Sequence, residues 1–478
     1  MAHIFIAAAH KSSGKTSVTL GLAAALVRRG LTVQPFKKGP DYIDPLWLAH
    51  AAGRPCYNLD FFTQSGAEIR DLFAAKSLGA DIALIEGNKG LFDGLDVEGT
   101  DSNAALATML AAPVLLVIDT GGMTRGIAPL LRGYQDFDAG VDIRGVILNK
   151  VGGARHEAKL RAALERYTDV EVLGALGRDV ALEIPERHLG LVPANEAGSA
   201  DGVIVQLADA VSAGIDLDRI IEVANTPGPG AGRIDPAGSS QRRQPGVQVS
   251  ERPCKQPAAR PDVRIAIARD AAFGFYYPDD LEAFADAGAE LIPFDARCDG
   301  HLPAADGLFI GGGFPETQLA ALAANQGLLA DIRRALTAGM PAYAECGGLM
   351  YLARSIQWRG ERRDMVGFVP ADVIVGARPQ GRGYMVLEET GNCPWPPSSA
   401  AQGTVTASIP AHEFHYARLE NLPPELNYAY RIVRGAGIDG RHDGIVIANL
   451  VAGFAHHRNT GANPWVERFV QFVREKSG

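Results

Sequence analysis

Cys346 lies in the segment best suited to covalent chemistry. The apolar run Met340–Glu345 predicts a strand, and a helical pattern begins at Leu349. A cysteine on such a sharp strand-to-helix turn forms a nucleophile elbow with sulfur in place of a serine hydroxyl. The positive end of the helix dipole and nearby backbone N–H groups favour a thiolate. We therefore expect a lowered pKa for Cys346 and a role as an acyl-transfer nucleophile.

A phosphate-binding pattern opens the same chain. The segment Ala9–Thr16 follows the apolar run His3–Ala8 and begins a helical pattern, although Ala9 replaces the usual first glycine. Gly14 allows close backbone approach, Lys15 supplies a cation for the β and γ phosphates, and Thr16 supplies a hydroxyl for Mg²⁺. The alternative is a Gly-Lys helix start of the kind any α/β protein can have. A nucleotide site and a thiol site together predict an ATP-driven ligase that releases its own nitrogen. The candidate nucleotide-binding residues in this loop are Ser13, Gly14, Lys15 and Thr16.

Two other polar residues close predicted strands. Glu86 follows the strand Ile82–Ile85 and could bind Mg²⁺ directly or through water, or it could cap a helix or carry a surface charge. The glycine-rich segment Gly87–Gly94 after it predicts a flexible loop over a ligand. Asn149 follows the strand Val146–Leu148, and its amide could pair with adenine, although asparagine also ends strands for local reasons.

The loop Phe36–Pro45 concentrates charge after another predicted strand. It carries two lysines and two aspartates within a Gly/Pro framework, which could balance the charges of phosphate, metal and carboxylate in a transfer site. The alternative is an exposed charged turn. The charged residues are Lys37, Lys38, Asp41 and Asp44.

Composition excludes several classes of function. The 478 residues are 47% hydrophobic with a net charge of −9. Because the sequence has no stripe of basic residues next to aromatic ones, we expect no nucleic-acid partner. Five cysteines without CxxC spacing fit neither a disulfide framework nor a zinc site. With no export signal and no long apolar run, we expect a cytoplasmic protein that does not bind membranes, as a possible homodimer.

Alternating strand-like and helical segments predict two α/β domains with largely parallel sheets. The segment 226–262 is rich in Pro and Gly and contains no Phe, Tyr, Trp, Leu or Met. Such a segment cannot bury enough apolar surface to offset its ordering entropy, so we expect a flexible linker. Its arginines could instead form a recruitment site. The predicted domains are residues 1–225, which bind ATP, and residues 263–478, which carry Cys346.

Over nearly its whole length the chain resembles the cobyrinic acid a,c-diamide synthases. The motifs that carry this resemblance are Ser13–Thr16, Lys38–Pro45, Glu86–Gly87, Gly90–Gly94, Pro185–Leu191, Ala268–Phe273, Phe275–Tyr277, Gly311–Glu316 and His412–Tyr416. The resemblance implies an N-terminal P-loop NTPase domain similar to dethiobiotin synthetase. It also implies a C-terminal class I glutamine amidotransferase domain with a flavodoxin-like α/β fold.

In that family, ATP phosphorylates a peripheral acetate of a tetrapyrrole, and ammonia from glutamine displaces the acyl phosphate, at positions a and c. The resemblance implies that Cys346 is the glutaminase nucleophile and that Gly312 and Gly313 form its oxyanion hole. It also implies roles for residues of the first domain. Those expected to bind Mg-ATP are Lys15, Thr16 and Glu86, with Thr16, Asp41 and Glu86 as the metal ligands. Those expected to handle the carboxylate and phosphoryl group are Lys37, Asp41, Asp44 and Asp93.

Two departures from common patterns leave alternatives open. Many amidotransferases end their triad with His-Pro-Glu, but no glutamate follows His456 by two residues here. The diamide synthases that the chain resembles also lack this glutamate. Either His456 or His457 is then the base, and the register favours His456. Asn88 and Lys89 also replace commoner residues on the substrate side. Together with the basic segment Arg378–Tyr384, they could attract a polycarboxylate.

The substrate and the class of protein have alternatives as well. Cobyrinate is the default substrate, and sirohaem or nickel sirohydrochlorin are the competitors. A partitioning-type ATPase with a binding module, or a thiol hydrolase with a vestigial nucleotide domain, are the rival classes.

Overall fold

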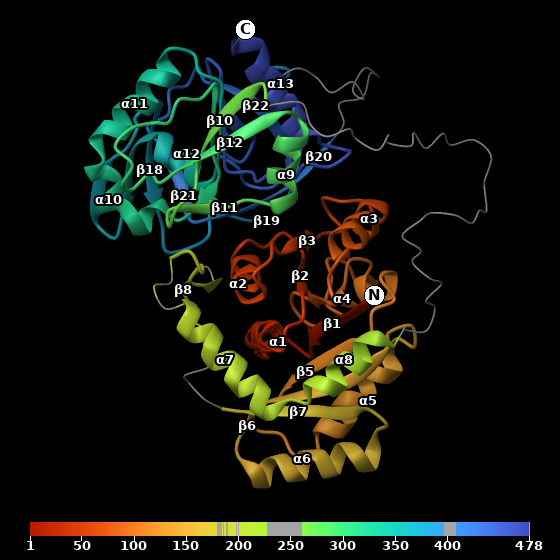
Figure 1. Cartoon of the computed structure of the whole chain (residues 1–478). Coiled ribbons are helices and arrows are strands. Elements are labelled where there is room, and N and C mark those ends of the chain that lie inside the picture. The colour runs from red at the N-terminus through yellow and green to blue at the C-terminus, as the bar shows by residue number, and fades with distance from the viewer. Residues whose placement is uncertain are drawn as a thin grey trace, which may run out of the picture. The chain divides into compact units, whose positions relative to one another are not determined.

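The computed structural model describes residues 1–178, 184, 186–187, 190–196, 198, 200–226, 261–395 and 408–477. The chain forms two compact units, Met1–Pro245 and Gly246–Gly478 (Figure 1). Most of the predicted linker 226–262 lies outside the described residues, with its arginines and Cys254, as do Pro185, His188 and Leu189 of the Pro185–Leu191 motif.

The first unit is built on a seven-stranded sheet in which every pair of neighbouring strands is parallel. Parallel sheets are covered on both faces, so their strands are nearly continuous apolar runs, as Ile4–Ala8 shows. In sheet order the strands are β3 (Tyr57–Leu59), β2 (Val33–Lys38), β4 (Ile82–Glu86), β1 (Ala2–Ala8), β5 (Val114–Asp119), β6 (Ile143–Val151) and β7 (Glu171–Gly177).

Two apolar cores cover the two faces of this sheet. Side chains alternate along β1, so that Ile4 and Ile6 enter one core while Phe5 and Ala7 enter the other. The first core also contains α1 (Lys15–Arg28), α2 (Ile43–Ala52), α7 (Ala200–Gly214) and α8 (Leu217–Asn225). The second contains α3 (Gly66–Ser77), α4 (Asn103–Met109), α5 (Ile127–Phe137) and α6 (Ala154–Tyr167). A short antiparallel pair, β8 (Glu186–Arg187) and β9 (Gly190–Leu191), precedes α7.

The second unit has a nine-stranded mixed sheet. Its first five strands are parallel, as predicted, whereas the last four form an antiparallel extension that the sequence did not indicate. In sheet order they are β12 (Ala289–Phe294), β10 (Val263–Ala268), β13 (Gly307–Ile310), β15 (Ala342–Glu345), β24 (Leu450–Gly453), β23 (His442–Ile447), β22 (Asn427–Arg434), β19 (Gly381–Glu389) and β20 (Ile409–His415).

Helices again pack into separate cores on the two faces of this sheet. One core contains α9 (Pro278–Asp286) and α13 (Trp465–Ser477). The other contains α10 (Leu319–Ala324), α11 (Gln326–Thr337) and α12 (Gly347–Leu352). Smaller elements are the pair β11 (Phe273–Phe275) and β14 (Gly312–Gly313), the 3₁₀ helix η2 (Pro315–Gln318), and a sheet of β17 (Glu361–Asp364), β16 (Ala353–Trp358), β18 (Val369–Val375) and β21 (Ala417–Glu420).

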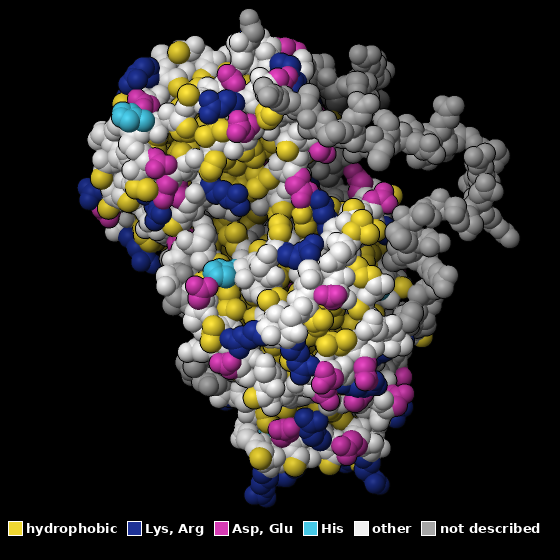
Figure 2. Space-filling model, in the orientation of Figure 1, with side chains coloured by type: hydrophobic (Ala, Val, Ile, Leu, Met, Phe, Trp, Pro, Cys, Tyr) yellow, Lys and Arg dark blue, Asp and Glu magenta, His cyan; other side chains and the backbone are white. Residues whose placement is uncertain are grey.

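The surface carries both signs of charge. On the face shown in Figure 2, Lys and Arg side chains are interspersed with Asp and Glu. Within the described parts of the chain, no helix is long and apolar enough to cross a bilayer.

Candidate active sites

The phosphate loop lies between the end of β1 and the first turn of α1, as predicted. Gly14 has a left-handed backbone with φ 83°, and a Cβ added there would lie 2.1 Å from Asn149 Nδ2. Asn149 Nδ2 donates to the carbonyl of Ser13 at 2.8 Å, so it supports the loop. Its predicted contact with adenine stays a prediction. The Ser13 hydroxyl donates to the carbonyl of His10 at 2.7 Å, within the same turn.

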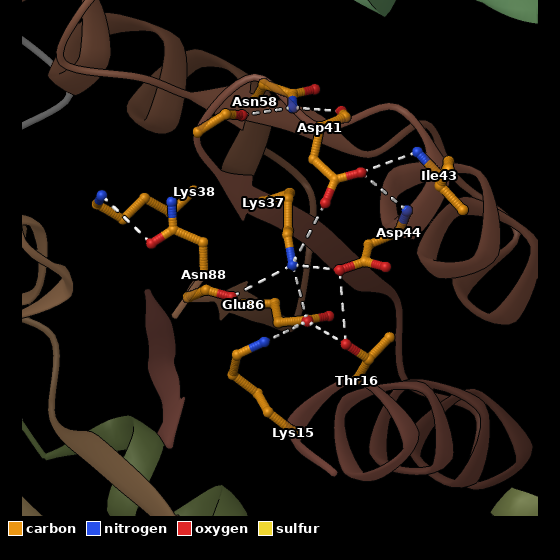
Figure 3. Close-up of polar contacts among 12 residues, drawn as sticks. Lys15, Thr16, Lys37, Lys38, Asp41, Ile43, Asp44, Asn58, Glu86 and Asn88 are labelled. Carbon is orange, nitrogen blue, oxygen red and sulfur yellow. Dashed lines mark hydrogen bonds and ion pairs between the residues drawn. The ribbon is translucent and has the colours of Figure 1, made fainter. Parts of the chain in front are cut away.

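Lys37 is the centre of a buried charge cluster at the carboxyl ends of β1, β2 and β4 (Figure 3). Its Nζ lies 2.5 Å from Asp44 Oδ2 and 2.9 Å from Glu86 Oε1. Asp41 Oδ2 is farther away, at 3.9 Å. The Asp41 carboxylate also accepts backbone N–H bonds from Ile43 and Asp44, and so caps α2. The Phe36–Pro45 loop is therefore an organised cluster rather than an exposed charged turn.

Glu86 joins this cluster to the phosphate loop. Its Oε1 lies 2.9 Å from Lys15 Nζ and accepts the Thr16 hydroxyl at 2.8 Å. Thr16 Oγ1 also lies 3.5 Å from Asp44 Oδ2. Lys15 and Thr16 begin α1 whereas Lys37 lies on β2, so the phosphate loop and the charged loop form one site around Glu86.

The charges in this cluster shift one another's pKa. Burial alone would lower the pKa of Lys37, but its three carboxylate neighbours outweigh burial and hold the pKa above its usual value. Burial favours the neutral form of Glu86, yet the ammonium groups of Lys15 and Lys37 lower its pKa to about 2. Burial and the charge of Asp44 raise the pKa of Asp41. Glu86 is therefore an anion held between two cations.

The donor set fits Mg²⁺ bound together with nucleotide phosphates. Glu86 is fully buried, and its second oxygen, Oε2, has no hydrogen-bond partner among the described residues. No group of three or more His, Cys, Asp or Glu in the described structure could hold a metal by itself. Mg²⁺ commonly takes one or two carboxylates and completes its shell with phosphates and water. Glu86 and Thr16 are suited to supply the protein part of such a shell.

The loop after β4 contacts this cluster, because Lys37 Nζ donates to the carbonyl of Gly87 at 3.3 Å. Asn103 fixes it, because its Oδ1 accepts from Asn88 N while its Nδ2 donates to the carbonyls of Asn88 and Gly90. Asp93 Oδ2 accepts from Gly90 N at 2.9 Å. Lys38 Nζ lies 3.5 Å from Asn88 Oδ1, and burial lowers the pKa of this lysine. The predicted flexible loop is thus tied down, and Asn103, which sequence reasoning missed, ties it.

The second site lies at the carboxyl ends of β15 and β24. Cys346 has φ 47° and ψ −100°, and its backbone N–H donates to the carbonyl of Gly453 at 2.7 Å. Glycines follow because space is short: a Cβ on Gly348 would lie 2.2 Å from the carbonyl oxygen of Ile310. The strained turn between β15 and α12 is the predicted elbow.

The predicted oxyanion residues lie next to both catalytic candidates. A Cβ added to Gly347 would lie 3.0 Å from Gly313 N, so β14 passes directly beside the turn that carries Cys346. A Cβ added to Gly312 would lie 2.5 Å from His456 Cε1. Glycine at position 312 thus leaves room for the His456 ring, and glycine at position 347 lets the elbow pass close to β14.

His456 and His457 have different surroundings. The His456 ring stacks on His412 with ring centres 4.9 Å apart and faces Gly312. The His457 ring packs against Tyr430 and lies 3.2 Å, Nδ1 to Nδ2, from Asn463. Burial lowers the pKa of His457 to about 4. His456 therefore lies beside a predicted oxyanion residue, and which of the two histidines serves Cys346 stays a prediction.

The thiol itself differs from expectation. Burial and the charge of Glu316 raise the pKa of Cys346, and a backbone hydrogen bond from Gly347 offsets only part of that effect. The following helix, Gly347–Leu352, is short, so its dipole does not outweigh desolvation. The expected lowered pKa is therefore wrong, and the resting group is a neutral thiol that needs a base.

Asp443 is a further buried residue that sequence reasoning missed. It accepts backbone N–H bonds from Phe454 and Ala455 at 3.0 and 2.9 Å, which fixes the turn that leads to His456. Burial raises the pKa of Asp443 to about 6 despite these hydrogen bonds. Asp443 lies in β23, one of the antiparallel strands that the sequence did not indicate, so no pattern in the sequence singled it out.

A phosphate loop on a parallel sheet and a cysteine elbow with a buried histidine define a nucleotide-dependent glutamine amidotransferase. Family models agree: residues 4–192 match the CobQ/CobB/MinD/ParA nucleotide binding domain, and residues 264–463 match the CobB/CobQ-like glutamine amidotransferase domain.

Similar proteins cover the whole chain. A cobyrinate a,c-diamide synthase of Magnetococcus marinus is 46% identical over 99% of this chain and 97% of its own length. Those of Methanosarcina acetivorans and Caldanaerobacter subterraneus are 38% and 36% identical, over 95% and 98% of this chain and 91% and 98% of their own lengths. The chain belongs to the cobyrinate a,c-diamide synthase family and is a glutamine-hydrolysing ligase.

Proposed function

We propose that this enzyme uses ATP and glutamine to amidate the a and c acetates of a sirohydrochlorin-derived tetrapyrrole, with cobyrinate as the substrate. The observation that carries the proposal is the similarity to cobyrinate a,c-diamide synthases across both units, each of which contains its own reactive cluster. A partitioning-type ATPase is not favoured, because residues 264–463 match an amidotransferase domain.

In the first unit, a substrate carboxylate oxygen attacks the γ-phosphorus of ATP, the bond to the β-phosphate oxygen breaks, and an acyl phosphate forms. The ammonium groups of Lys15 and Lys37 are available to neutralise charge on the transferred group. Mg²⁺, held through Thr16 and Glu86 with Asp41 as the further candidate ligand, would supply additional positive charge. Asp44 and Asp93 are proposed to orient the carboxylate and the phosphoryl group.

In the second unit, Cys346 attacks the side-chain amide of glutamine. Ammonia leaves, and water hydrolyses the thioester to glutamate. The backbone N–H groups of Gly312 and Gly313 are proposed to hold the oxyanion. Ammonia then displaces phosphate from the acyl phosphate, which completes one amidation. A reducing cytoplasm would suit this thiol chemistry, and the four described cysteines form no disulfide.

The test uses the purified enzyme with Mg-ATP and either glutamine or ammonium chloride. Cobyrinate, sirohaem and nickel sirohydrochlorin are offered separately, and mass spectrometry follows each conversion of a carboxylate to an amide. We expect two amidations of cobyrinate, and we expect Cys346→Ser to lose only the reaction with glutamine. A higher kcat/KM for sirohaem would change the substrate but keep the chemistry. Failure with every tetrapyrrole, or glutamine-driven turnover by Cys346→Ser, would overturn the proposal.

A further inference from the structure

The position where many amidotransferases carry a triad glutamate holds Arg458 in this chain. Arg458 follows His456 by two residues, and its side chain is 1% exposed. Its Nη2 lies 2.7 Å from Asp279 Oδ2, and its guanidinium covers the Tyr277 ring at 4.3 Å. Arg458 is thus paired with Asp279, and a guanidinium has no acceptor for a hydrogen bond from a ring N–H of His456.

The carboxylate near His456 belongs to Glu345, the residue before the nucleophile. Glu345 ends β15 and is 3% exposed. Its Oε1 accepts the Tyr343 hydroxyl at 2.6 Å and the His457 backbone N–H at 3.0 Å. Its Oε2 lies 3.4 Å from His456 Nδ1. Two donors therefore fix one oxygen of Glu345, and the second oxygen faces the imidazole.

The orientation of the ring gives this contact a chemical meaning. His456 is held flat against His412, with ring planes 17° apart, and its Cε1 faces Gly312. A neutral imidazole carries its proton on one nitrogen and its lone pair on the other. The 3.4 Å between Nδ1 and the carboxylate is an ion-pair distance rather than a hydrogen bond. A negative charge on this side of the ring favours the tautomer with its proton on Nδ1 and its basic lone pair on Nε2.

We propose that Glu345 is the positioning residue that takes the place of the missing triad glutamate. This inference rests on the proposed glutaminase role of Cys346. As the Cys346 sulfur bonds to the amide carbon of glutamine, the thiol proton passes to His456 Nε2, and the imidazolium forms beside Glu345. The C–N bond then breaks, and the same proton leaves with ammonia. Water repeats the cycle: its oxygen bonds to the carbonyl carbon, the C–S bond breaks, and its proton returns through His456 to the sulfur.

A carboxylate beside His456 matters because the Cys346 thiol is neutral at rest. Transfer of its proton creates an anion–cation pair inside a buried site, and an isolated buried charge is costly. Glu345 supplies a fixed negative charge next to the new cation. In a Ser-His-Asp hydrolase, replacing the aspartate by its amide lowers turnover by about 10⁴-fold by favouring the wrong tautomer.

The experiment compares Glu345→Gln with a matched variant, Glu413→Gln. Glu413 is also 3% exposed, lies 3.4 Å from a histidine, His415, and accepts two backbone N–H bonds. Glutamate release from glutamine and amidation driven by ammonium are measured for both variants across pH. For Glu345→Gln we expect glutaminase kcat to fall by about 10²-fold or more with little change in ammonium-driven amidation, and for Glu413→Gln no selective loss.

Two further measurements keep the inference falsifiable if Glu345→Gln folds poorly. Tyr343→Phe removes a donor from Glu345 without changing its charge, and it should lower glutaminase kcat selectively but less. Nitrogen NMR of wild-type histidines, with His456 assigned through His456→Ala, should show the proton on Nδ1. Protonation on Nε2, an equal loss in both activities, or an equal effect of Glu413→Gln would overturn the inference. If glutamate release depends on Glu345 but no tetrapyrrole is amidated, the inference stands and the proposed function fails.

Discussion

The backbone N–H of Cys346 donates to the carbonyl of Gly453, the last residue of β24, at 2.7 Å. This single bond joins the ends of two parallel strands, one leading to the nucleophile and the other to His456 three residues later. Parallel neighbours present their carboxyl ends at the same sheet edge, so residues more than a hundred positions apart meet there. The pairing of β15 with β24 therefore positions the proposed glutaminase site. The phosphate loop belongs to the other unit, so variants at each site should affect different activities.

The two adjacent histidines should respond differently to truncation. His456→Ala is expected to abolish glutamate release, because the neutral Cys346 thiol would lose its base, and to retain ammonium-driven amidation. His457→Ala should mainly lower stability, since its ring packs against Tyr430. Glutamate release and thermal unfolding of both variants are the measurements. If His457→Ala were the inactive variant with normal stability, His457 would be the base.

The phosphate site should be needed with either nitrogen source. Lys15→Ala and Glu86→Gln remove groups that hold the transferred phosphoryl group, and losses of about 10²-fold or more in kcat are expected with glutamine and with ammonium alike. Cys346→Ser, which should lose only the glutamine reaction, is the control. Near-normal amidation by Lys15→Ala with ammonium would show that ATP is used elsewhere.

Lys37 should matter for stability as well as for activity. Lys37→Met would leave Asp44 and Glu86 with one buried cation fewer, and removing one partner from a buried ion cluster costs about 3–5 kcal/mol. The contrast is Arg219→Met, which removes an exposed, solvent-screened pair with Glu171 and should cost far less. Guanidinium unfolding of both variants gives the two values. Equal losses would mean that the Lys37 cluster is not effectively buried.

Stability should fall on acidification partly through His457. The folded state holds the pKa of this histidine near 4, against an ordinary value of 6.5, because burial disfavours the cation. Between these two pH values, His457 is protonated in the unfolded chain and neutral in the folded chain. The contribution of neutral, buried His457 to the free energy of unfolding is therefore complete above pH 6.5 and is lost as pH falls toward 4.

Replacing His457 by Asn should reduce the slope of unfolding free energy against pH in that window by up to about 1.4 kcal/mol per pH unit. The exposed His301→Asn serves as control. Denaturant titrations at several pH values, followed by tryptophan fluorescence, measure the slope. An unchanged slope in His457→Asn would contradict the shifted pKa.

The sequence predicted the parts of the fold that depend on local pattern. Strands buried on both faces, such as Ile4–Ala8, are continuous apolar runs. Glu86 is the last residue of β4, close to its predicted place after the strand, whereas Asn149 lies inside β6 and does not follow it. The antiparallel strands of the second unit were missed because their burial follows no regular pattern; Asn427–Arg434, for example, alternates only in part.

The candidate sites were predictable as residue types but not as contacts. Cys346 and Lys15 follow recognisable local patterns. The contact between Glu345 and His456 depends on the register of β15 with β24, in which Glu345 lies opposite Gly453. The raised pKa of Cys346 was missed because the neighbouring sequence indicates a helix dipole, whereas the burial of the thiol depends on residues far away in the chain.

Burial of Cys346 also bears on how long the enzyme keeps its nucleophile. Peroxide attacks thiolates, and the first oxidation product, a sulfenic acid, forms most readily at exposed cysteines of low pKa. Cys346 is 6% exposed and protonated at rest. A hydrogen bond with Asp295 raises the pKa of Cys298 as well, but Cys298 is exposed, so the two thiols differ in accessibility. The reactive sulfur is thus kept in its least oxidisable form between turnovers, and damage under oxidative stress should appear first at a surface thiol that takes no part in the chemistry.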